Sequence, residues 1–249
     1  MKVATSSASF ARPLADGTLT QLEWLDLCAN ELELDGVVFD AAHFPRTDDE
    51  YLAQLKKTCA DLGLTVAALA TEAFASSDAG DGAFATALAL GAPLIVASPP
   101  RSDEDPSSWG RFTDRARETA AAAKRHNVTL AVRNAAGTLC PAIADLRRLG
   151  KDVDSAWLRF ALDPLAAGAG DPAATLEKTA IASTALDAIG SFAGDADDRA
   201  PTLIRALARF RGFVVLDSAD AAAPRDAYHA AVARFTALRA TALDQPATG

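Results

Sequence analysis

Short apolar segments alternate with longer amphipathic segments eight times along this chain of 249 residues, with no change of composition and no linker between them. Regular alternation of strands and helices is typical of parallel sheets, and about 250 residues is the usual length of a closed (β/α)8 barrel. We therefore predict a single α/β domain, a (β/α)8 TIM barrel over residues 1–249; an open doubly wound sheet is the alternative. The expected strands are 2–10, 37–40, 64–70, 93–97, 128–132, 158–162, 180–186 and 212–216.

Helix-capping signals mark the starts of several expected helices. Thr20 with Glu23, and Thr47 with Glu50, have the spacing of a capping box, in which two side chains satisfy free backbone N–H groups at the helix start. Gly63 has the position of a residue that ends a helix. The expected helices are 20–33, 47–62, 82–90, 107–127, 141–150, a segment from Asp171, 201–210 and 224–242.

Polar residues follow the apolar strands at one end. The segment from Val128 to Val132 is nearly continuously apolar, as in a strand buried on both faces, and it ends in Arg133 and Asn134. Asp40, Glu72, Asp163 and Asp217 stand at the ends of four other expected strands. In a (β/α)8 barrel the carboxyl ends of the strands carry the functional residues. We expect these side chains to face one mouth.

Charge and cysteine content exclude several classes of function. The net charge is −9 and the pI about 4.8, with no basic stripe, so we expect no nucleic-acid partner. The three cysteines form no CxxC pair, which argues against a zinc knuckle or a disulfide framework. We find neither a signal peptide nor an apolar run long enough to span a membrane, and we expect a cytoplasmic protein without a membrane partner.

Several segments resemble one family in their order and spacing. They are 35–40, 60–65, 128–134, 157–163 and 210–217. The segment 128–134 is similar to the Leu-Ala-Leu-Glu-Asn-His strand of the xylose-isomerase-like TIM barrels. That family contains sugar phosphate isomerases and epimerases and AP endonuclease family 2. The resemblance implies the barrel fold and a carbohydrate ligand.

The resemblance also implies a divalent metal site, which this chain keeps only in part. Family enzymes hold the metal with a Glu, an Asp, a His and a second Glu at the ends of strands five to eight. The first Glu falls on Arg133, the Asp on Asp163 and the second Glu on Asp217, and no His occurs near Ser183. We therefore predict no cofactor; Mn or Mg would bind only if this ligand assignment is wrong. We expect Arg133 to occupy the metal position and to bridge the two acids.

Other candidates at the mouth have structural alternatives. Asp163, Asp217 and His43 are the candidate catalytic residues, with His43 as an acid or base. The alternative for His43 is a structural hydrogen bond. Glu72 and Asp40 are candidate ligand-binding residues or members of ion pairs. Trp109 is a candidate for stacking on a sugar, or it packs at the start of a helix. Asn134, like Arg133, is a candidate ligand-binding residue, or it caps the loop.

Three functions remain open from the sequence. The first is a sugar isomerase/epimerase-like barrel that has lost most of the metal site and binds a small polar sugar or sugar acid. The second is an active isomerase, epimerase or lyase with a different arrangement of His43, Arg133, Asp163 and Asp217. The third is a structural or partner-binding barrel. The sequence leaves open whether the chain is an enzyme and whether it forms a homodimer.

Overall fold

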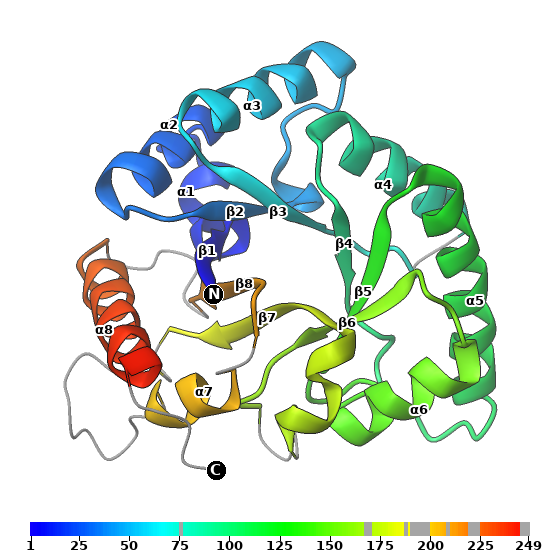
Figure 1. Cartoon of the computed structure of the whole chain (residues 1–249). Coiled ribbons are helices and arrows are strands. Elements are labelled where there is room, and N and C mark those ends of the chain that lie inside the picture. Colours follow the sequence, from blue (N-terminus) through cyan, green and yellow to red (C-terminus); the bar gives the residue numbers. More distant parts are fainter. Residues whose placement is uncertain are drawn as a thin grey trace.

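The computed structural model is a closed barrel of eight parallel strands in chain order (Figure 1). The structure describes residues 1–74, 77–166, 171–186, 189, 200–207, 210–218 and 225–244. The predicted fold class is therefore confirmed, and the open sheet is excluded. The strands are β1 (Lys2–Ser6), β2 (Gly36–Asp40), β3 (Thr65–Ala70), β4 (Leu94–Ala97), β5 (Thr129–Arg133), β6 (Leu158–Leu162), β7 (Thr179–Ala185) and β8 (Phe213–Asp217).

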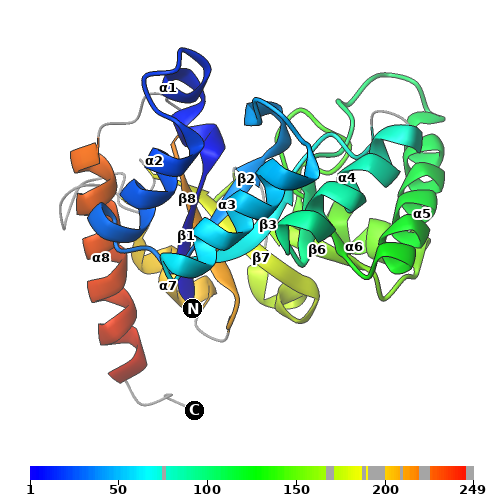
Figure 2. The same ribbon diagram turned by 90° about the horizontal axis from the view of Figure 1, so that it is seen from above.

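Helices surround the barrel on the outside (Figures 1 and 2). Figure 2 shows the first of them, α1, beyond the barrel on the side opposite the N-terminus. The α-helices are α1 (Ala11–Ala15), α2 (Gln21–Asp26), α3 (Asp49–Asp61), α4 (Ser77–Leu90), α5 (Ser108–His126), α6 (Ile143–Val153), α7 (Ala200–Ala206) and α8 (Arg225–Asp244). Shorter helical segments are η1 (Ser7–Phe10), η2 (Leu27–Glu31), η3 (Ala41–His43) and η4 (Pro172–Lys178).

The barrel interior is filled by a separate cluster of small and branched side chains, to which every strand contributes. Five of its nine members are alanines, and four of them are Ala4, Ala68, Ala131 and Ala161. Alanine fills little volume, so the interior layer leaves room for longer side chains that stand above it at the strand ends. The remaining members are Val38, Ala67, Val96, Ile181 and Val215.

The main core lies between the strands and the helices, and Trp24 is its largest fully buried side chain. Its ring packs edge-on against Phe39 of β2 at 5.4 Å and against Phe10 at 6.4 Å, between ring centroids. Phe10 in turn stacks on Tyr228 of α8 at 5.3 Å. These aromatic contacts connect α2, β2, η1 and α8, so the first and last parts of the chain share one packing unit.

Two expected boundaries differ from the structure. The first strand ends at Ser6 and not at Phe10, because the Ser6 hydroxyl accepts a hydrogen bond from the Ala8 N–H and starts η1. The cap of α3 is Asp48 and not Thr47, since the Asp48 carboxylate accepts from the Tyr51 N–H at 3.0 Å. The capping box of Thr20 and Glu23 is present as predicted. Apart from the first, each strand begins and ends within one residue of its expected bounds.

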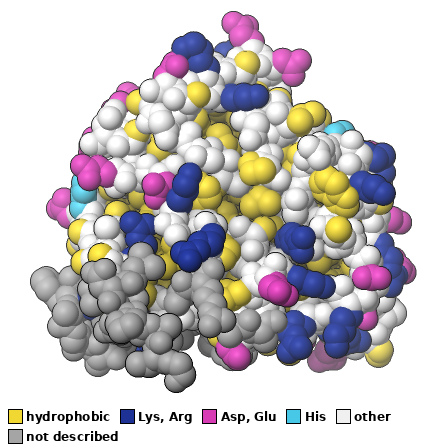
Figure 3. Space-filling model, in the orientation of Figure 1, with side chains coloured by type: hydrophobic (Ala, Val, Ile, Leu, Met, Phe, Trp, Pro, Cys, Tyr) yellow, Lys and Arg dark blue, Asp and Glu magenta, His cyan; other side chains and the backbone are white. Residues whose placement is uncertain are grey.

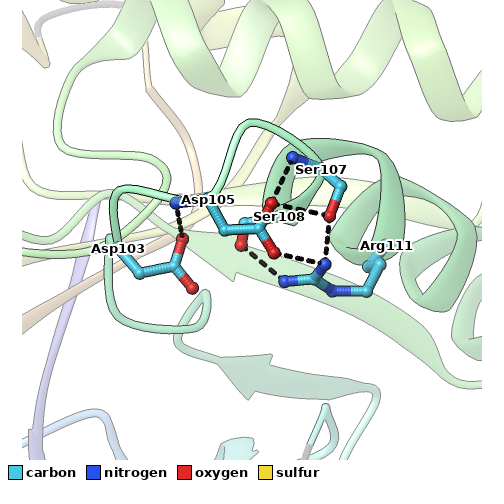
Figure 4. Close-up of polar contacts among 5 residues, drawn as sticks. All are labelled: Asp103, Asp105, Ser107, Ser108 and Arg111. Atoms are coloured by element: carbon cyan, nitrogen blue, oxygen red, sulfur yellow. Dashed lines mark hydrogen bonds and ion pairs between the residues drawn. The ribbon is translucent and has the colours of Figure 1, made fainter.

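The loop between β4 and α5 is fixed by an exposed carboxylate (Figure 4). Asp105 accepts hydrogen bonds from the N–H and the hydroxyl of Ser107, both at 2.8 Å, and pairs with Arg111 at 2.8 Å. The bond from the Ser107 N–H, followed by Arg111 and the Ser107 hydroxyl, lowers the pKa of Asp105 to about 2. This loop is therefore held from within by its own side chains at neutral pH.

Figure 3 shows the face of the barrel at which the strands begin. Hydrophobic side chains lie near its centre, with Lys and Arg around them. At the start of β1, the Lys2 ammonium lies 5.5 Å from the ring centroid of Phe213, the first residue of β8. No helix in the described part of the chain has both the length and the apolar character needed to cross a bilayer.

Candidate functional site

Strand alternation brings four of the predicted residues to the same end of the barrel interior. Each of them stands two residues after an interior residue of the cluster. Asp40, Arg133 and Asp217 end β2, β5 and β8, and Asp163 directly follows β6. Side chains alternate between the two faces of a strand, so all four point to the inside at the carboxyl end. We call this end the mouth. All eight strands are parallel, so their carboxyl ends surround it.

Asp217 is held in place by the serines that follow β1. Its Oδ1 accepts hydrogen bonds from the Ser6 N–H at 3.2 Å and from the Ser9 hydroxyl at 3.4 Å. The Ser9 oxygen also accepts from the Ser218 N–H at 2.9 Å. The sequence analysis did not select these serines, although the run Ser6-Ser7-Ala8-Ser9 directly after an apolar strand was a usable signal.

Burial raises the pKa of Asp217 above its usual value. The charge of Arg133 and the hydrogen bonds from Ser6 and Ser9 act in the opposite direction, and the charge of Asp163 raises the pKa further. These effects show that the two acids and the guanidinium are within electrostatic reach of one another. An acid with a raised pKa can both hold and release a proton at pH values closer to neutrality.

Arg133 does not form the direct bridge that we expected from the sequence. Within the described residues, no ion pair within 4.0 Å joins it to Asp163 or Asp217. Its Nε is buried and has no hydrogen-bond partner in that part of the chain. The positive charge of Arg133 nevertheless lowers the pKa of Asp217. Arg133 therefore acts on Asp217 through its charge and not through a direct bridge, and its buried Nε–H is available to donate a hydrogen bond.

Asn134 positions Asp163 through two hydrogen bonds. Its Oδ1 accepts from the Asp163 N–H at 2.8 Å, and its Nδ2 donates to the Asp163 carbonyl at 3.0 Å. The Asp163 Oδ1 accepts from the Leu165 N–H at 2.9 Å. Both functional groups of the buried Asn134 amide are thus engaged with the backbone, which gives this residue a structural role and makes it a poor ligand contact.

His43 lies beside the end of β1. Its Nδ1 is 3.2 Å from the Ser7 hydroxyl oxygen, which accepts a hydrogen bond from the Asp40 N–H at 2.8 Å. A hydroxyl oxygen can accept two hydrogen bonds and donate one, so Ser7 serves His43 Nδ1 in either tautomer of the imidazole. The carboxylate of Asp40 accepts from the Ala42 N–H at 2.9 Å and so caps η3.

The remaining two candidates have different surroundings. Glu72 follows β3 by two residues and is exposed. Trp109 lies on α5, where its Nε1 donates to Asp152 at 2.9 Å and the Arg148 guanidinium lies 4.1 Å from its ring centroid. The structure therefore brings Trp109 to the contact between α5 and α6 and not to the mouth. Its ligand-binding role remains only a prediction.

The described residues at the mouth do not fit the ligand set of a divalent metal. Two of them, Asp163 and Asp217, offer carboxylate oxygens, whereas the cationic Arg133 lies within electrostatic reach of Asp217. Among the described residues, no group of three or more His, Cys, Asp or Glu side chains is arranged to hold a metal ion. A hard divalent ion needs several anionic or neutral oxygen ligands and is repelled by a neighbouring guanidinium.

The raised pKa of Asp217 predicts a pH-dependent loss of stability. The folded state disfavours the carboxylate, so the contribution of this residue to stability is fully present below its unfolded pKa of about 3.9 and is lost as the pH rises through the folded pKa. In urea unfolding between about pH 4 and pH 8, the free energy of unfolding should fall with rising pH relative to that of Asp217→Asn.

Asp16 supplies a control of opposite sign for this measurement. Hydrogen bonds from the side chain and the backbone of Thr18 lower its pKa. Relative to Asp16→Asn, the native protein should therefore gain stability as the pH rises from the folded pKa of Asp16 to its unfolded pKa of about 3.9, so this control is measured below about pH 5. If the free energy of unfolding of the native protein rises with pH relative to Asp217→Asn, as it should relative to Asp16→Asn, the environment that we assign to Asp217 is wrong.

Comparison with known proteins places these observations in context. The family model of the xylose isomerase-like TIM barrel matches residues 27–191, more than half of the chain. No curated protein sequence matches this chain. The structure is similar to that of an L-ribulose 3-epimerase, with a TM-score of 0.78 and 16% identity over 100% of this chain and 99% of that chain.

Two further similar structures have other functions. The probable 3-DHS dehydratase AsbF from Bacillus anthracis has a TM-score of 0.75 and 15% identity, covering 95% of this chain and 99% of that chain. AP endonuclease, family 2 from Brucella melitensis has a TM-score of 0.68 and 18% identity, covering 88% and 93%. At such identities the similarity shows the fold alone, because one barrel fold supports many reactions.

Proposed function

Because the chain belongs to the xylose isomerase-like TIM barrel family, we propose that its mouth binds a small sugar acid without the metal-dependent isomerisation of its relatives. The observation that carries this proposal is the buried Nε of Arg133, which lacks a hydrogen-bond partner within the described residues. A buried donor without a partner costs free energy, and a ligand oxygen that accepts from it removes this cost. The guanidinium fork matches the two oxygens of a carboxylate.

The other residues of the mouth give the ligand its polar character. Asp163 and Asp217 are acceptors for sugar hydroxyl groups in their ionised forms, and Asp217 is also a donor in its protonated form. The Nε2 of His43, whose Nδ1 contacts Ser7, is a further polar atom for the ligand, as donor or acceptor according to the tautomer. A sugar acid, which has a carboxylate next to several hydroxyl groups, is therefore the ligand that best fits a site with one guanidinium and two aspartate side chains.

Titration calorimetry with three sugars tests this proposal. Gluconate and glucuronate should bind, whereas glucose, which lacks the carboxylate, should bind at least about tenfold more weakly, since a charged hydrogen bond is worth about 1.5–3 kcal/mol. Arg133→Gln should remove the preference for the acids. Arg159→Gln is the matched control, because Arg159 lies two residues before Ala161 and so faces the opposite end of the barrel interior. Equal affinity for the three sugars would contradict the proposal.

A second candidate function is acid–base catalysis at the same mouth, which the raised pKa of Asp217 favours. In this case Asp217 and His43 exchange a proton with a carbon next to the substrate carbonyl, and Arg133 stabilises the developing negative charge on oxygen. Incubation with ketoses or keto acids in D2O tests it by NMR. Deuterium uptake that Asp217→Asn abolishes supports catalysis. If no sugar binds or exchanges, the structural or partner-binding barrel is the better description.

A further inference from the structure

A groove of about 550 Å3 opens next to the mouth, between the segment that follows β1 and the segment that follows β2. Its volume lies within the range of small-molecule sites. Its walls are mostly apolar, and two aromatic rings, those of Phe44 and Tyr51, contribute to them. The other lining residues are Leu14, Ala15, Gly17, Leu19, Thr20, Gln21, Leu22, Ala42, His43 and Pro45.

Gln21 supplies a buried polar group to this groove. Only 4% of its surface is exposed. Its Nε2 donates to the His43 carbonyl at 2.9 Å, and its Oε1 is buried without a hydrogen-bond partner in the described residues. A hydroxyl group can donate to an amide oxygen, so Oε1 of Gln21 calls for a hydroxyl group in the ligand.

The walls of the groove are held in place by the surrounding contacts. The Gln21 side chain joins α2 to η3. The guanidinium of Arg46 lies 5.0 Å from the ring centroid of Tyr51 and pairs with Asp48 at 3.4 Å. Phe44 packs against Phe39 of the core at 5.5 Å. The groove is therefore a preformed cavity with aromatic walls, which favours a flat apolar ligand over a flexible polar one.

We propose that this groove binds a planar apolar ring that carries a hydroxyl group. The ring packs between the apolar walls, and its hydroxyl group donates to Oε1 of Gln21. The proposal does not depend on sugar-acid binding at Arg133, because the polar contact here is with Gln21 and the walls of the groove are apolar.

The groove and the mouth adjoin each other through two neighbouring residues. The Ser6 N–H donates to Asp217 in the mouth, and the next residue, Ser7, contacts His43 of the groove. One ligand with a polar head in the mouth and a ring in the groove is therefore compatible with this arrangement, and an aryl glycoside acid has that chemistry. This extension, unlike the groove itself, rests on the proposed function.

Binding of phenol to the full chain tests the groove. We expect saturable binding, followed by two-dimensional ¹⁵N NMR, with shifts at the Gln21 side-chain amide and the backbone N–H groups of Ala42 and His43. Anisole has the ring without the donor and should bind about fivefold more weakly, as expected for one lost hydrogen bond of about 1 kcal/mol. Cyclohexanol, which has the donor without a planar ring, should also be weaker.

Two alanine-to-tryptophan variants separate the groove from the rest of the surface. Ala42→Trp places an indole in the groove from an exposed position and should weaken phenol binding at least about tenfold. Ala53→Trp, on the exposed face of α3, is the matched control and should leave the affinity unchanged. Shifts that map elsewhere, absence of saturation, or equal affinity of phenol for both variants overturns the proposal.

Arg133→Gln distinguishes a failure of the groove from a failure of the proposed function. This variant should lose gluconate binding and keep phenol binding. If phenol binds at Gln21 but no sugar acid binds, the groove stands and the proposed function does not. If gluconate binds and phenol does not, the proposed function stands and the groove proposal does not.

Discussion

Replacing Trp24 with alanine is expected to lower the free energy of unfolding by about 3–5 kcal/mol, as for other large aromatic side chains removed from a core. The side chain is fully buried, and it contacts Phe39 and Phe10. Its removal leaves a cavity where α2, β2 and η1 meet. Because Phe10 also stacks on Tyr228, the loss should extend to the packing of α8. Urea unfolding followed by circular dichroism measures the change.

Trp24→Phe and Trp109→Ala are the controls for this experiment. Phenylalanine keeps most of the buried area and removes the indole N–H, which has no hydrogen-bond partner among the described residues, so Trp24→Phe should cost about 1–2 kcal/mol. Trp109 is only partly buried and contacts Arg148 and Asp152 at the surface, so Trp109→Ala should cost about 1 kcal/mol. A loss for Trp24→Ala no larger than that for Trp109→Ala would show that the aromatic unit is not central to the core.

The barrel could be predicted from the sequence because its strands are short apolar runs that helical patterns separate. β6 falls exactly where the run Leu158–Leu162 predicts it, since apolar runs bounded by turns define buried parallel strands. The segment after β1 was not predictable in this way. Residues 7–22 form η1, α1 and the start of α2, and hydrogen bonds of single side chains, such as that of Ser6, decide where each begins.

The candidate site was predictable in position but not in its contacts. Strand alternation alone places Asp40, Arg133, Asp163 and Asp217 in the mouth. Which atoms meet depends on rotamers and on distances of a few ångströms, which no pattern encodes. The described residues therefore show no direct bridge from Arg133 to the two acids, and the contact of Ser9 with Asp217 was missed, whereas the ligand-binding role of Trp109 stays a prediction. The groove at Gln21 was likewise invisible, because its walls come from segments that the fold brings together.

Arg133→Glu is expected to destabilise the protein by about 3–4 kcal/mol, and Arg133→Ala by about 1–2 kcal/mol, in urea unfolding near neutral pH. Alanine removes the charge that lowers the pKa of Asp217, whereas glutamate places a third carboxylate beside Asp217 and Asp163. Two unit charges about 6 Å apart at an effective dielectric constant of about 20 repel by about 3 kcal/mol. Protonation of one acid limits the total cost, so the difference should shrink as the pH falls toward about 5.

Divalent metal separates charge repulsion from simple loss of packing in these two variants. Arg133→Glu restores a third acidic oxygen ligand at the mouth, so Mn²⁺ or Mg²⁺ at about one hundred times its dissociation constant should return about 2.7 kcal/mol. Arg133→Ala offers only two acids, and the native protein opposes the ion with a guanidinium, so both should respond much less. Metal should therefore stabilise Arg133→Glu most, Arg133→Ala less and the native protein least. Equal responses would show that position 133 does not face the acids, and stoichiometric metal binding by the native protein would show that other residues supply the ligands.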